Sequence, residues 1–404
     1  MTLSGTECPC KSEKKIIGLY LSVQPSAGGM FQYAQCILRA LSDIRSGGVF
    51  EVVVAYSDER WINIIDLFQL PAVRLRHLVA GTFVARVFMA LFLLPNFART
   101  LSGVLNPVVL ELRRIKCNIW VFPAQDELTW QVEGPVIATI HDLMHRYERS
   151  FPESGSWWRY LLREHRFRNL ANQSAAVLVD SNLGKCHVID SYAAQVERVH
   201  SLPYIAPNYI TSSVERPDFD LFYDLPEKFF FYPAQFWRHK NHWRLVNAIA
   251  AAKHTCPDMA IVFAGGLKHE YYNIKFNITN IGLEDSVRFV GYVPDDDIGG
   301  FYKRARGLVM PTFFGPTNIP PLEAMALGCP VLVSRIYAMM QQCGDAALYF
   351  DPNSISEMRD QMIRLWTDDL LHCTLAARGL IRTEAWGRVQ FGSRLSEIIR
   401  DVLA

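Results

Sequence analysis

The N-terminal half of the chain alternates short, continuously apolar runs with longer stretches of helical period. The apolar runs are rich in β-branched residues, which is typical of strands buried on both faces of a parallel sheet. We expect such strands at Ile16–Leu21, Glu51–Tyr56, Asn118–Phe122, Val136–Ile140 and Ala176–Asp180. After the first of them, Phe31–Ser42 places its apolar residues on one face, which predicts an amphipathic helix.

This pattern breaks after Pro207, where Pro217, Pro226 and several acidic residues follow without a sustained period. The alternation then begins again, with strands expected at Phe229–Tyr232, Ile261–Ala264, Val287–Val290, Leu308–Pro311, Val331–Ser334 and Ala347–Phe350. Two blocks of strand–helix alternation predict an α/β fold of two Rossmann-like, doubly wound domains. We place a flexible tail at 1–14, the domains at 15–207 and 227–380, and a linker at 208–226. Ligands of such sheets bind beyond the carboxyl ends of the strands, so we expect the site in the cleft between the domains.

Composition narrows the class of protein. With 404 residues, 50% of them apolar, the chain is long enough for two or three domains with large cores. A formal net charge of +1 argues against a nucleic-acid partner held by a broad basic face. The 12% aromatic and 20% charged residues exclude intrinsic disorder. We expect no secretory signal peptide, because residues 1–15 are polar.

One segment raises the question of membrane contact. Leu78–Leu94 is apolar but only 17 residues long, contains Arg86, and is followed by Pro95. A spanning helix needs about 20 apolar residues, so we expect a buried or amphipathic helix. Contact with a membrane surface stays open as an alternative.

The nine cysteines form no C-x-x-C pair and are scattered over Cys8, Cys10, Cys36, Cys117, Cys186, Cys256, Cys329, Cys343 and Cys373. Reduced thiols of a cytosolic protein therefore fit better than a zinc cluster or a redox site. The acidic run Asp295–Asp297 precedes a helical pattern at Ile298–Ala305, so we interpret it as the first turn of a helix rather than as metal ligands. The sequence predicts no metal site.

Two strand ends carry candidate binding residues. Gly28 and Gly29 follow a strand and precede a helix, where backbone N–H groups can approach an anion, although a plain tight turn has the same sequence. His141 and Asp142 end another strand. The histidine either faces the cleft and donates to a substrate hydroxyl or is a core histidine, with Asp142 capping the next helix.

A third junction, from Tyr232 to Asn241, places Arg238, Lys240 and Asn241 beside a helix N-terminus. Cations at that end of a helix suit a diphosphate, because their charge and the helix dipole act on the same anion. A solvated basic loop is the alternative. We favour the diphosphate because Lys240 enters an otherwise apolar helix.

The strongest signal is the stretch from Pro311 to Ser334, where a strand gives way to a proline-rich loop. A short helix is expected to begin near Pro320 and to end at Gly328, with Glu323 in its first turn. The helix directs its free N–H groups at whatever the loop holds, and an acidic residue there also stabilises the helix dipole.

Residues 320–326 (Pro-Pro-Leu-Glu-Ala-Met-Ala) with 328–331 (Gly-Cys-Pro-Val) resemble the signature of family 4 glycosyltransferases, which have the GT-B fold. The resemblance extends over nearly the whole chain. It includes Gly28-Gly29, Thr139–Leu143, Val287–Pro294, Gly344–Ala347, Phe350–Pro352 and Trp386, which match successive motifs of that family in the same order.

The resemblance implies roles for individual residues. Glu323 would bind the ribose hydroxyls of a nucleotide, Lys240 its diphosphate, and His141 a hydroxyl of the transferred sugar. Further contacts with the donor would come from Gly28, Gly29, Gln235, Arg238, Thr317, Asn318, Ile319 and the backbone of Tyr292 and Val293, which reads the base.

The reaction implied is transfer of a sugar from a nucleotide-sugar donor to a glycan or lipid-linked acceptor, with retention at the anomeric carbon and without a metal or cofactor. The N-terminal domain would bind the acceptor, and the C-terminal helix at 381–404 would pack back on that domain. We expect a role in surface polysaccharide synthesis, of O-antigen or capsule type, in the cytoplasm or at the inner face of the cell membrane, with peripheral contact through 78–94.

Two positions depart from the family pattern. The first glutamate of its Glu-x7-Glu motif is replaced by Gly315, and an arginine often found five residues before the lysine is replaced by Gln235. An active subgroup in which Thr317, Asn318 and nearby N–H groups hold the sugar is favoured, because the loop is rigid and polar. The alternatives are a non-catalytic nucleotide-sugar-binding subunit and a GT-B epimerase.

Overall fold

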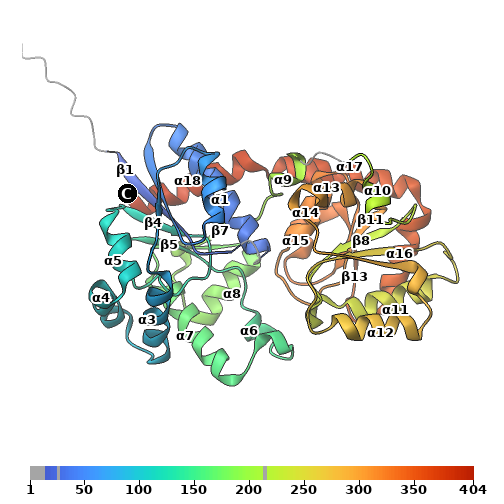
Figure 1. Ribbon diagram of the computed structural model, residues 1–404, viewed down its shortest axis with the longest axis horizontal. Helices are drawn as coiled ribbons and strands as arrows, with labels where there is room; N and C mark the ends of the chain where they lie inside the picture. Colours follow the sequence, from blue (N-terminus) through green and yellow to red (C-terminus); the bar gives the residue numbers. More distant parts are fainter. Residues whose placement is uncertain (1–13, 25–27, 213–215) are drawn as a thin grey trace, which may run out of the picture.

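The computed structural model describes residues 14–24, 28–212 and 216–404. Cys8, Cys10 and the expected flexible tail up to residue 13 lie outside the described residues, as do positions 25–27 before Gly28. Two lobes lie side by side, each built around a parallel β-sheet (Figure 1). The expectation of two doubly wound α/β domains is therefore confirmed.

The first sheet has, within the described residues, seven strands in the order β3-β2-β1-β4-β5-β6-β7. Their bounds are β1 (Lys15–Leu21), β2 (Phe50–Tyr56), β3 (Ala72–Arg74), β4 (Ile119–Phe122), β5 (Val136–Thr139), β6 (Ala176–Val179) and β7 (Val199–Ser201). The central strands β4, β5 and β6 are buried at every position, as their continuous apolar sequences require. All the pairs are parallel, with Ile17 opposite Val52 in the β1–β2 register.

The second sheet has the order β10-β9-β8-β11-β12-β13. Its strands are β8 (Phe230–Pro233), β9 (Ile261–Ala264), β10 (Val287–Gly291), β11 (Gly307–Met310), β12 (Val331–Ser334) and β13 (Ala347–Phe350). The neighbours β8 and β11 are not consecutive in the chain, so the strand order reverses between them. A crevice opens at such a point beyond the strand ends, which is where ligands of open α/β sheets bind.

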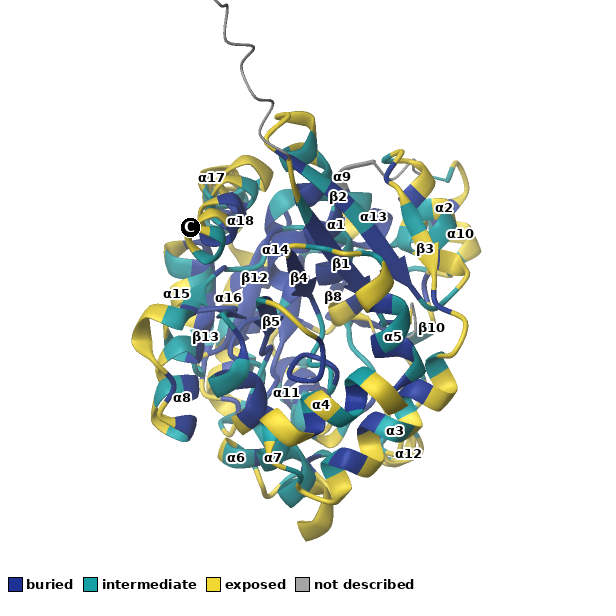
Figure 2. Cartoon of the chain, turned by 90° about the vertical axis from the view of Figure 1, so that its left-hand side faces the viewer, coloured by how far each residue is buried: buried dark blue, intermediate teal, exposed yellow. Residues whose placement is uncertain are grey.

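Helices cover the sheets and connect the strands (Figure 2). In the first lobe these are α1 (Gly29–Ser46), α2 (Arg60–Asp66), α3 (Leu78–Ala90), α4 (Pro95–Leu105), α5 (Pro107–Arg114), α6 (Met144–Tyr147), α7 (Trp157–Gln173) and α8 (Asn182–Tyr192). The connecting segment holds α9 (Tyr209–Ser212) and α10 (Phe219–Phe222). The second lobe holds α11 (His242–Ala252), α12 (Tyr271–Asn280), α13 (Asp295–Arg304), α14 (Ile319–Ala326), α15 (Met339–Cys343), α16 (Ile355–Thr367) and α17 (Asp369–Ala385).

The last helix, α18 (Arg388–Leu403), returns to the first lobe and lies beside α1 (Figure 1). Its buried Phe391 and Leu395 belong to the same apolar cluster as Leu19 and Leu38. The chain therefore ends in the domain in which it begins, and it crosses between the lobes twice.

The apolar segment that begins at Leu78 does not form an interior helix. Helix α3 buries only Gly81, Ala85 and Phe88, whereas Val79 is 86% exposed and Phe83 is 67% exposed. The expectation that this segment could form a buried helix is therefore wrong for the side of α3 that carries Val79 and Phe83. Among the described residues, no helix is long and apolar enough to span a membrane.

Candidate functional site

The loop between β11 and α14 is held in one conformation by its own side chains. Gly315 has φ +118°, and a Cβ atom there would lie 2.6 Å from Asn318 Nδ2. The Asn318 N–H donates to Gln342 Oε1 (3.0 Å), and Gln342 Nε2 donates to the Asn318 carbonyl (2.6 Å). The glycine that replaces the expected glutamate is therefore required by the shape of the loop, because any side chain at that position would be strained and would meet Asn318.

Two helix N-termini approach each other across the cleft. Gly28 precedes α1 with φ +60°, and a Cβ on Gly29 would lie 3.4 Å from Ile319 Cδ1, at the start of α14. The structure thus brings Gly28, Gly29 and Ile319 together, as the resemblance implies. Free N–H groups and helix dipoles directed at one region favour an anion there.

Lys240 lies at the end of the 3₁₀ turn η4 (Arg238–Lys240), directly before α11. The Tyr232 hydroxyl donates to its carbonyl oxygen at 2.8 Å, which fixes the backbone at this position. Burial lowers the pKa of Lys240 to about 8, and the carboxylates of Asp142 and Glu153 in the first domain act in the opposite direction. Lys240 is therefore a cation at neutral pH that faces the first domain across the cleft.

Three other residues of this junction have surroundings different from those of Lys240. Arg238 is exposed and lines a large groove that Lys240 does not line. The Gln235 side chain accepts a hydrogen bond from Trp237 Nε1 at 2.9 Å. Asn241 is buried and donates to the carbonyl oxygens of Pro311 (3.0 Å) and Pro352 (2.8 Å), so it ties the loops together.

Glu323 is 5% exposed and accepts two tyrosine hydroxyl groups. Tyr302 donates to its Oε2 at 2.6 Å, and Tyr209 of the connecting segment donates to its Oε1. Burial raises the pKa of Glu323, and both tyrosine hydrogen bonds oppose that rise. The carboxylate that the resemblance assigns to ribose is thus already bonded to two hydroxyl groups of this chain.

The expected base-binding residues follow β10. The turn at Gly291 has φ +69°, and its carbonyl accepts the N–H of Gly265 at 2.7 Å. Tyr292 is 75% exposed and Val293 is 7% exposed. An exposed aromatic ring therefore lies at the end of this strand, beside a backbone that is held in place.

His141 is buried and both of its ring nitrogens have partners. Nε2 lies 3.0 Å from the carbonyl oxygen of Pro123, which can only accept, so Nε2 carries the proton. Nδ1 then accepts from the Tyr204 hydroxyl at 2.7 Å. Burial lowers the pKa of His141 to about 4, so it is neutral at pH 7. A sugar hydroxyl would reach this histidine only by taking the place of Tyr204.

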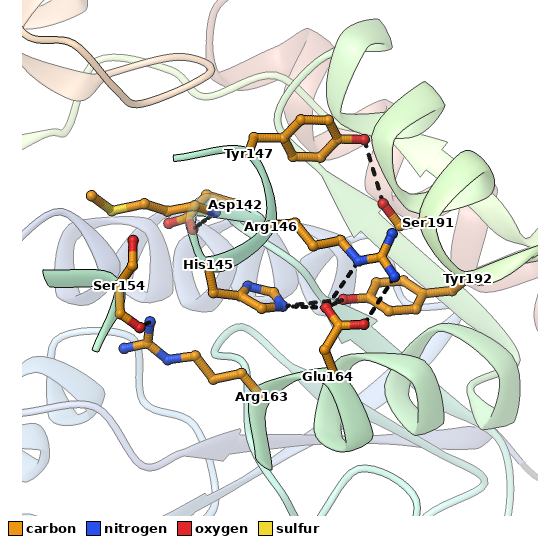
Figure 3. A network of polar contacts seen from close by, with 10 residues as sticks. Asp142, His145, Arg146, Tyr147, Ser154, Arg163, Glu164, Ser191 and Tyr192 are labelled. Carbon is orange, nitrogen blue, oxygen red and sulfur yellow. Dashed lines mark hydrogen bonds and ion pairs between the residues drawn. The ribbon is translucent and has the colours of Figure 1, made fainter. Parts of the chain in front are cut away.

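The segment after His141 is anchored by a polar network (Figure 3). Asp142 Oδ1 accepts the N–H of Met144 at 2.9 Å, as a cap of the short helix α6. On that helix His145 (2.8 Å) and Arg146 (2.9 Å) both donate to Glu164 of α7. Burial alone would raise the pKa of Glu164, but these hydrogen bonds lower it to about 2. The network fixes α6, and with it Asp142, against α7.

One residue of the cleft was missed by the sequence interpretation. Asp180 follows β6 and is 3% exposed. Its Oδ2 accepts the N–H of Thr317 at 3.0 Å and also the Thr317 hydroxyl, and its Oδ1 accepts the Ser181 hydroxyl at 2.9 Å. The sequence does contain a signal for this residue, because an aspartate directly follows four apolar positions of an expected strand. That pattern places a carboxylate at the carboxyl end of the strand. Thr317 and Asn318 thus lie in the cleft, but with protein partners.

A second cavity of 570 Å³ lies within the first domain, beyond the ends of β1 and β4. Asp126 and Glu127 line it together with Arg86 and Arg166. Burial and the neighbouring Glu127 raise the pKa of Asp126, and Arg86 Nε lies 3.3 Å from Glu127 Oε1. Carboxyl and guanidinium groups on one wall can bind the hydroxyl groups of a sugar.

The acidic run at the start of α13 is the helix first turn that the sequence predicts. Asp295 accepts Gln32 Nε2 at 2.9 Å, and Asp297 accepts the Tyr223 hydroxyl at 2.6 Å. Among the described residues, no group of three or more histidine, cysteine, aspartate or glutamate side chains could hold a metal ion.

Similarity to known proteins agrees with this architecture. HepE of Anabaena, solved with UDP and glucose, superimposes with a TM-score of 0.70 at 17% identity, over 96% of this chain and 100% of that one. The chain therefore has the GT-B fold of two facing Rossmann-like domains. Residues 215–379 match the family described as Glycosyl transferases group 1.

Two curated relatives are mannosyltransferases of O-antigen synthesis. O-antigen chain mannosyltransferase B of Escherichia coli is 36% identical over 101 residues, which are 25% of this chain and 26% of that protein. O-antigen chain mannosyltransferase RfbU of Salmonella typhimurium is 25% identical over 218 residues, which are 53% of this chain and 56% of that protein. The chain thus matches about a quarter and about half of the length of these two relatives.

Proposed function

We propose that this protein is a retaining, metal-independent glycosyltransferase that moves a mannosyl unit from a nucleotide-sugar donor to a glycan or lipid-linked acceptor. One observation carries the proposal. The start of α1 approaches the start of α14, the helix that carries Glu323, and Lys240 interacts with Asp142 and Glu153 of the first domain. The glycosyl transferases group 1 match covers Lys240, α14 and Glu323. The names of the curated relatives support mannose and a role in O-antigen or related surface polysaccharide synthesis.

The donor is held by charge and by exchange of hydrogen bonds. The ribose hydroxyls take the place of Tyr209 on Glu323, and the diphosphate lies between Lys240 and the start of α14. The exposed ring of Tyr292 and the backbone at Val293 contact the base. Where the family uses a glutamate, Thr317 and Asn318 contact the sugar, because Gly315 cannot carry a side chain.

Catalysis then follows from stabilisation of the leaving group. The bond between the anomeric carbon and the diphosphate oxygen breaks while negative charge grows on the diphosphate. Lys240 and the helix N-terminus stabilise that charge, a contribution of about 3–4 kcal/mol for a preorganised donor. The acceptor hydroxyl attacks from the same face, where the departing oxygen lies within reach of its proton.

The acceptor binds in the cavity of the first domain, where Asp126 and Glu127 accept its hydroxyl groups. Helix α3 supports a lipid-linked acceptor, because it lines this cavity with Leu78, Thr82 and Arg86 and exposes Phe83 on its outer face. We place the protein in the cytoplasm at the inner face of the membrane, with the exposed face of α3 in contact with lipid.

Nucleoside diphosphate release from a panel of GDP- and UDP-sugars tests the proposal. Release should require a mannoside acceptor and should persist in EDTA, and proton NMR should show an α-linked product from GDP-α-mannose. Tight donor binding without turnover would indicate a non-catalytic subunit. Conversion of the donor sugar without an acceptor would indicate an epimerase. Complete loss in EDTA that magnesium restores would contradict metal independence.

A further inference from the structure

One large cavity lined by described residues lies outside the proposed donor and acceptor sites. It is an open groove of 1180 Å³ that is bordered by Arg238 and the first turn of α11. Its walls are the first turns of α11 and α12, the segments after β12 and β13, and residues 148–151 of the first domain. The proposed reaction uses none of these residues.

Aromatic rings line part of a groove that is otherwise mostly polar. They are Phe151, Trp237, Trp243, Phe313 and Tyr337. The ring centroids of Phe151 and Phe313 lie 5.5 Å apart, so the aromatic surface continues across the boundary between the domains. Trp243 is 48% exposed although it lies on a helix that is otherwise well buried. Flat apolar rings beside polar groups suit the C–H faces of sugar rings, which need contact area and hydrogen bonds together.

The charged side chains that line the groove are equal in number for the two signs. Arg238, Arg244 and Arg335 face the same space as Glu148, Glu270 and Asp351. Three cations and three anions give no net preference for a charged ligand, which argues against a phosphate. Guanidinium groups donate, carboxylates accept, and the amides of Asn273 and Asn353 do both, so the walls match the mixed donors and acceptors of sugar hydroxyls.

The size and position of the groove favour several sugar units over one. A volume of 1180 Å³ is above the range of about 300–1,000 Å³ that is common for small-molecule sites. Its inner end borders the β11–α14 loop, where the Phe313 N–H donates to the His239 carbonyl at 2.8 Å. A chain that is being extended at the cleft could continue along this wall.

We propose that the groove is a second carbohydrate site, which binds a neutral oligosaccharide several residues away from the sugar that reacts. This inference rests on the proposed function, because it takes the oligosaccharide to be the chain under construction. It makes the protein a polymer-binding enzyme rather than one that recognises only a terminal sugar.

Direct binding tests this proposal without relying on turnover. Isothermal titration calorimetry with mannose, α-linked mannobiose and α-linked mannotetraose compares three probes of increasing length. The wild-type protein should bind the tetrasaccharide about tenfold more tightly than mannose. Trp243→Ala and Asn273→Ala change exposed residues of the groove, so both variants should fold normally and lose about 3- to 10-fold of that affinity. Trp157→Ala removes an exposed tryptophan outside the groove and is the matched control.

The outcomes separate this inference from the proposed function. If affinity does not rise with chain length, or if all three variants lower it equally, the groove is not a carbohydrate site. If the groove variants lose tetrasaccharide binding but the protein releases no nucleoside diphosphate from any donor, the second site stands and the proposed transfer fails. If transfer to methyl α-mannoside is normal but tetrasaccharide binding is absent, the transfer stands and the second site fails.

Discussion

The carboxylate of Asp180 accepts the backbone N–H of Thr317 at 3.0 Å, which joins the end of β6 to the β11–α14 loop of the other domain. The two residues are 137 positions apart in the chain. Both are buried, so this direct contact links the two halves of the cleft. It holds the proposed sugar-binding loop against the first domain.

Two substitutions of Asp180 should distinguish how its hydrogen bonds and its negative charge contribute to the free energy of unfolding. Asp180→Ala leaves the Thr317 N–H and hydroxyl without an acceptor, which should cost about 1–3 kcal/mol of unfolding free energy for each group. Asp180→Asn keeps an acceptor oxygen and removes a buried charge. Chemical denaturation at pH 7.5 should therefore show a large loss for alanine and none for asparagine.

The pH dependence of the melting temperature provides a second measurement on Asp180. Burial raises its pKa from 3.8 to about 6. The folded state thus holds this proton more tightly than the unfolded state, and the wild-type protein loses stability as the pH rises from about 4 to about 6. Asp180→Asn lacks this loss, so its advantage in melting temperature should grow over that interval and stay constant above it. Parallel curves would contradict the assignment.

Lys240 should limit activity at alkaline pH. Because its pKa is lowered from 10.5 to about 8, the cation is lost as the pH rises through that value. kcat/KM reports the free enzyme and should fall with an apparent pKa near 8. Lys240→Arg should abolish this decrease of kcat/KM at alkaline pH, because arginine stays charged.

Lys240→Ala should lower turnover by about 10²- to 10³-fold with no loss of melting temperature. Near-normal turnover of the alanine variant would remove the diphosphate role.

Glu323 and Tyr209 should have opposite effects on nucleotide affinity. Glu323→Ala removes a charged acceptor and should weaken binding of free nucleoside diphosphate by about 10- to 150-fold. Tyr209→Phe leaves Oε1 free for ribose and should tighten binding several-fold. Tyr302→Phe is the control, since Tyr302 contacts the other oxygen and need not leave. Calorimetry that shows unchanged affinity in Glu323→Ala would make this residue purely structural.

Gly315 should reject the glutamate that the motif of the resembled family has at this position. Gly315→Glu and Gly315→Ala both place a Cβ on a backbone with φ +118° and against Asn318. Each should lose about 1–3 kcal/mol of unfolding free energy in denaturant titrations. Gly266→Ala has no neighbour within 4 Å and should change stability little. Higher turnover of Gly315→Glu, with unchanged stability, would show that the loop accepts the residue.

The exposed side chains of the segment 78–94, which comprises α3 and the residues up to the start of α4, should bind vesicles that contain anionic lipid. Phe83 and Leu94 are 67% and 76% exposed, and Arg86 lies on the same segment. Replacing both apolar residues by serine should abolish co-sedimentation with phosphatidylglycerol vesicles and leave near-UV circular dichroism unchanged. Leu370→Ser, at an equally exposed leucine of α17, should sediment like the wild-type protein. A wild-type protein that never sediments ends this prediction.

Strand positions were predictable because central strands have continuous apolar sequences. Five expected strands of the first domain coincide with β1, β2, β4, β5 and β6 to within one residue at each end. The edge strands β3 and β7 were missed, since each has three residues and only Val199 among them is buried. Short, partly exposed edge strands lack the hydrophobic signal that identifies a buried strand.

Contacts between distant segments could not be predicted in the same way. The sequence places His141, Lys240 and Thr317 after strands, and each lies in the connection that follows β5, β8 or β11. It does not show that the Tyr204 hydroxyl bonds to His141 or that Arg238 lines the large groove. These outcomes depend on side chains that are far apart in the sequence and meet only in the folded protein. Helix α3 shows the same limit, because an apolar sequence does not say which partner will cover it.

The return of α18 to the first domain constrains how the two lobes can move relative to each other. One covalent connection runs through Pro207 and α9, and the other passes through Trp386, whose Nε1 donates to the Pro203 carbonyl at 3.0 Å. A single connection would leave the rotation of one lobe relative to the other unrestricted. Two neighbouring connections define a line that can serve as an axis of rotation. We expect the lobes to rotate about that line more easily than across it. In the proposed transfer, donor entry and nucleotide exit would use this same rotation, which would return Lys240 and the helix N-termini to the same relative position.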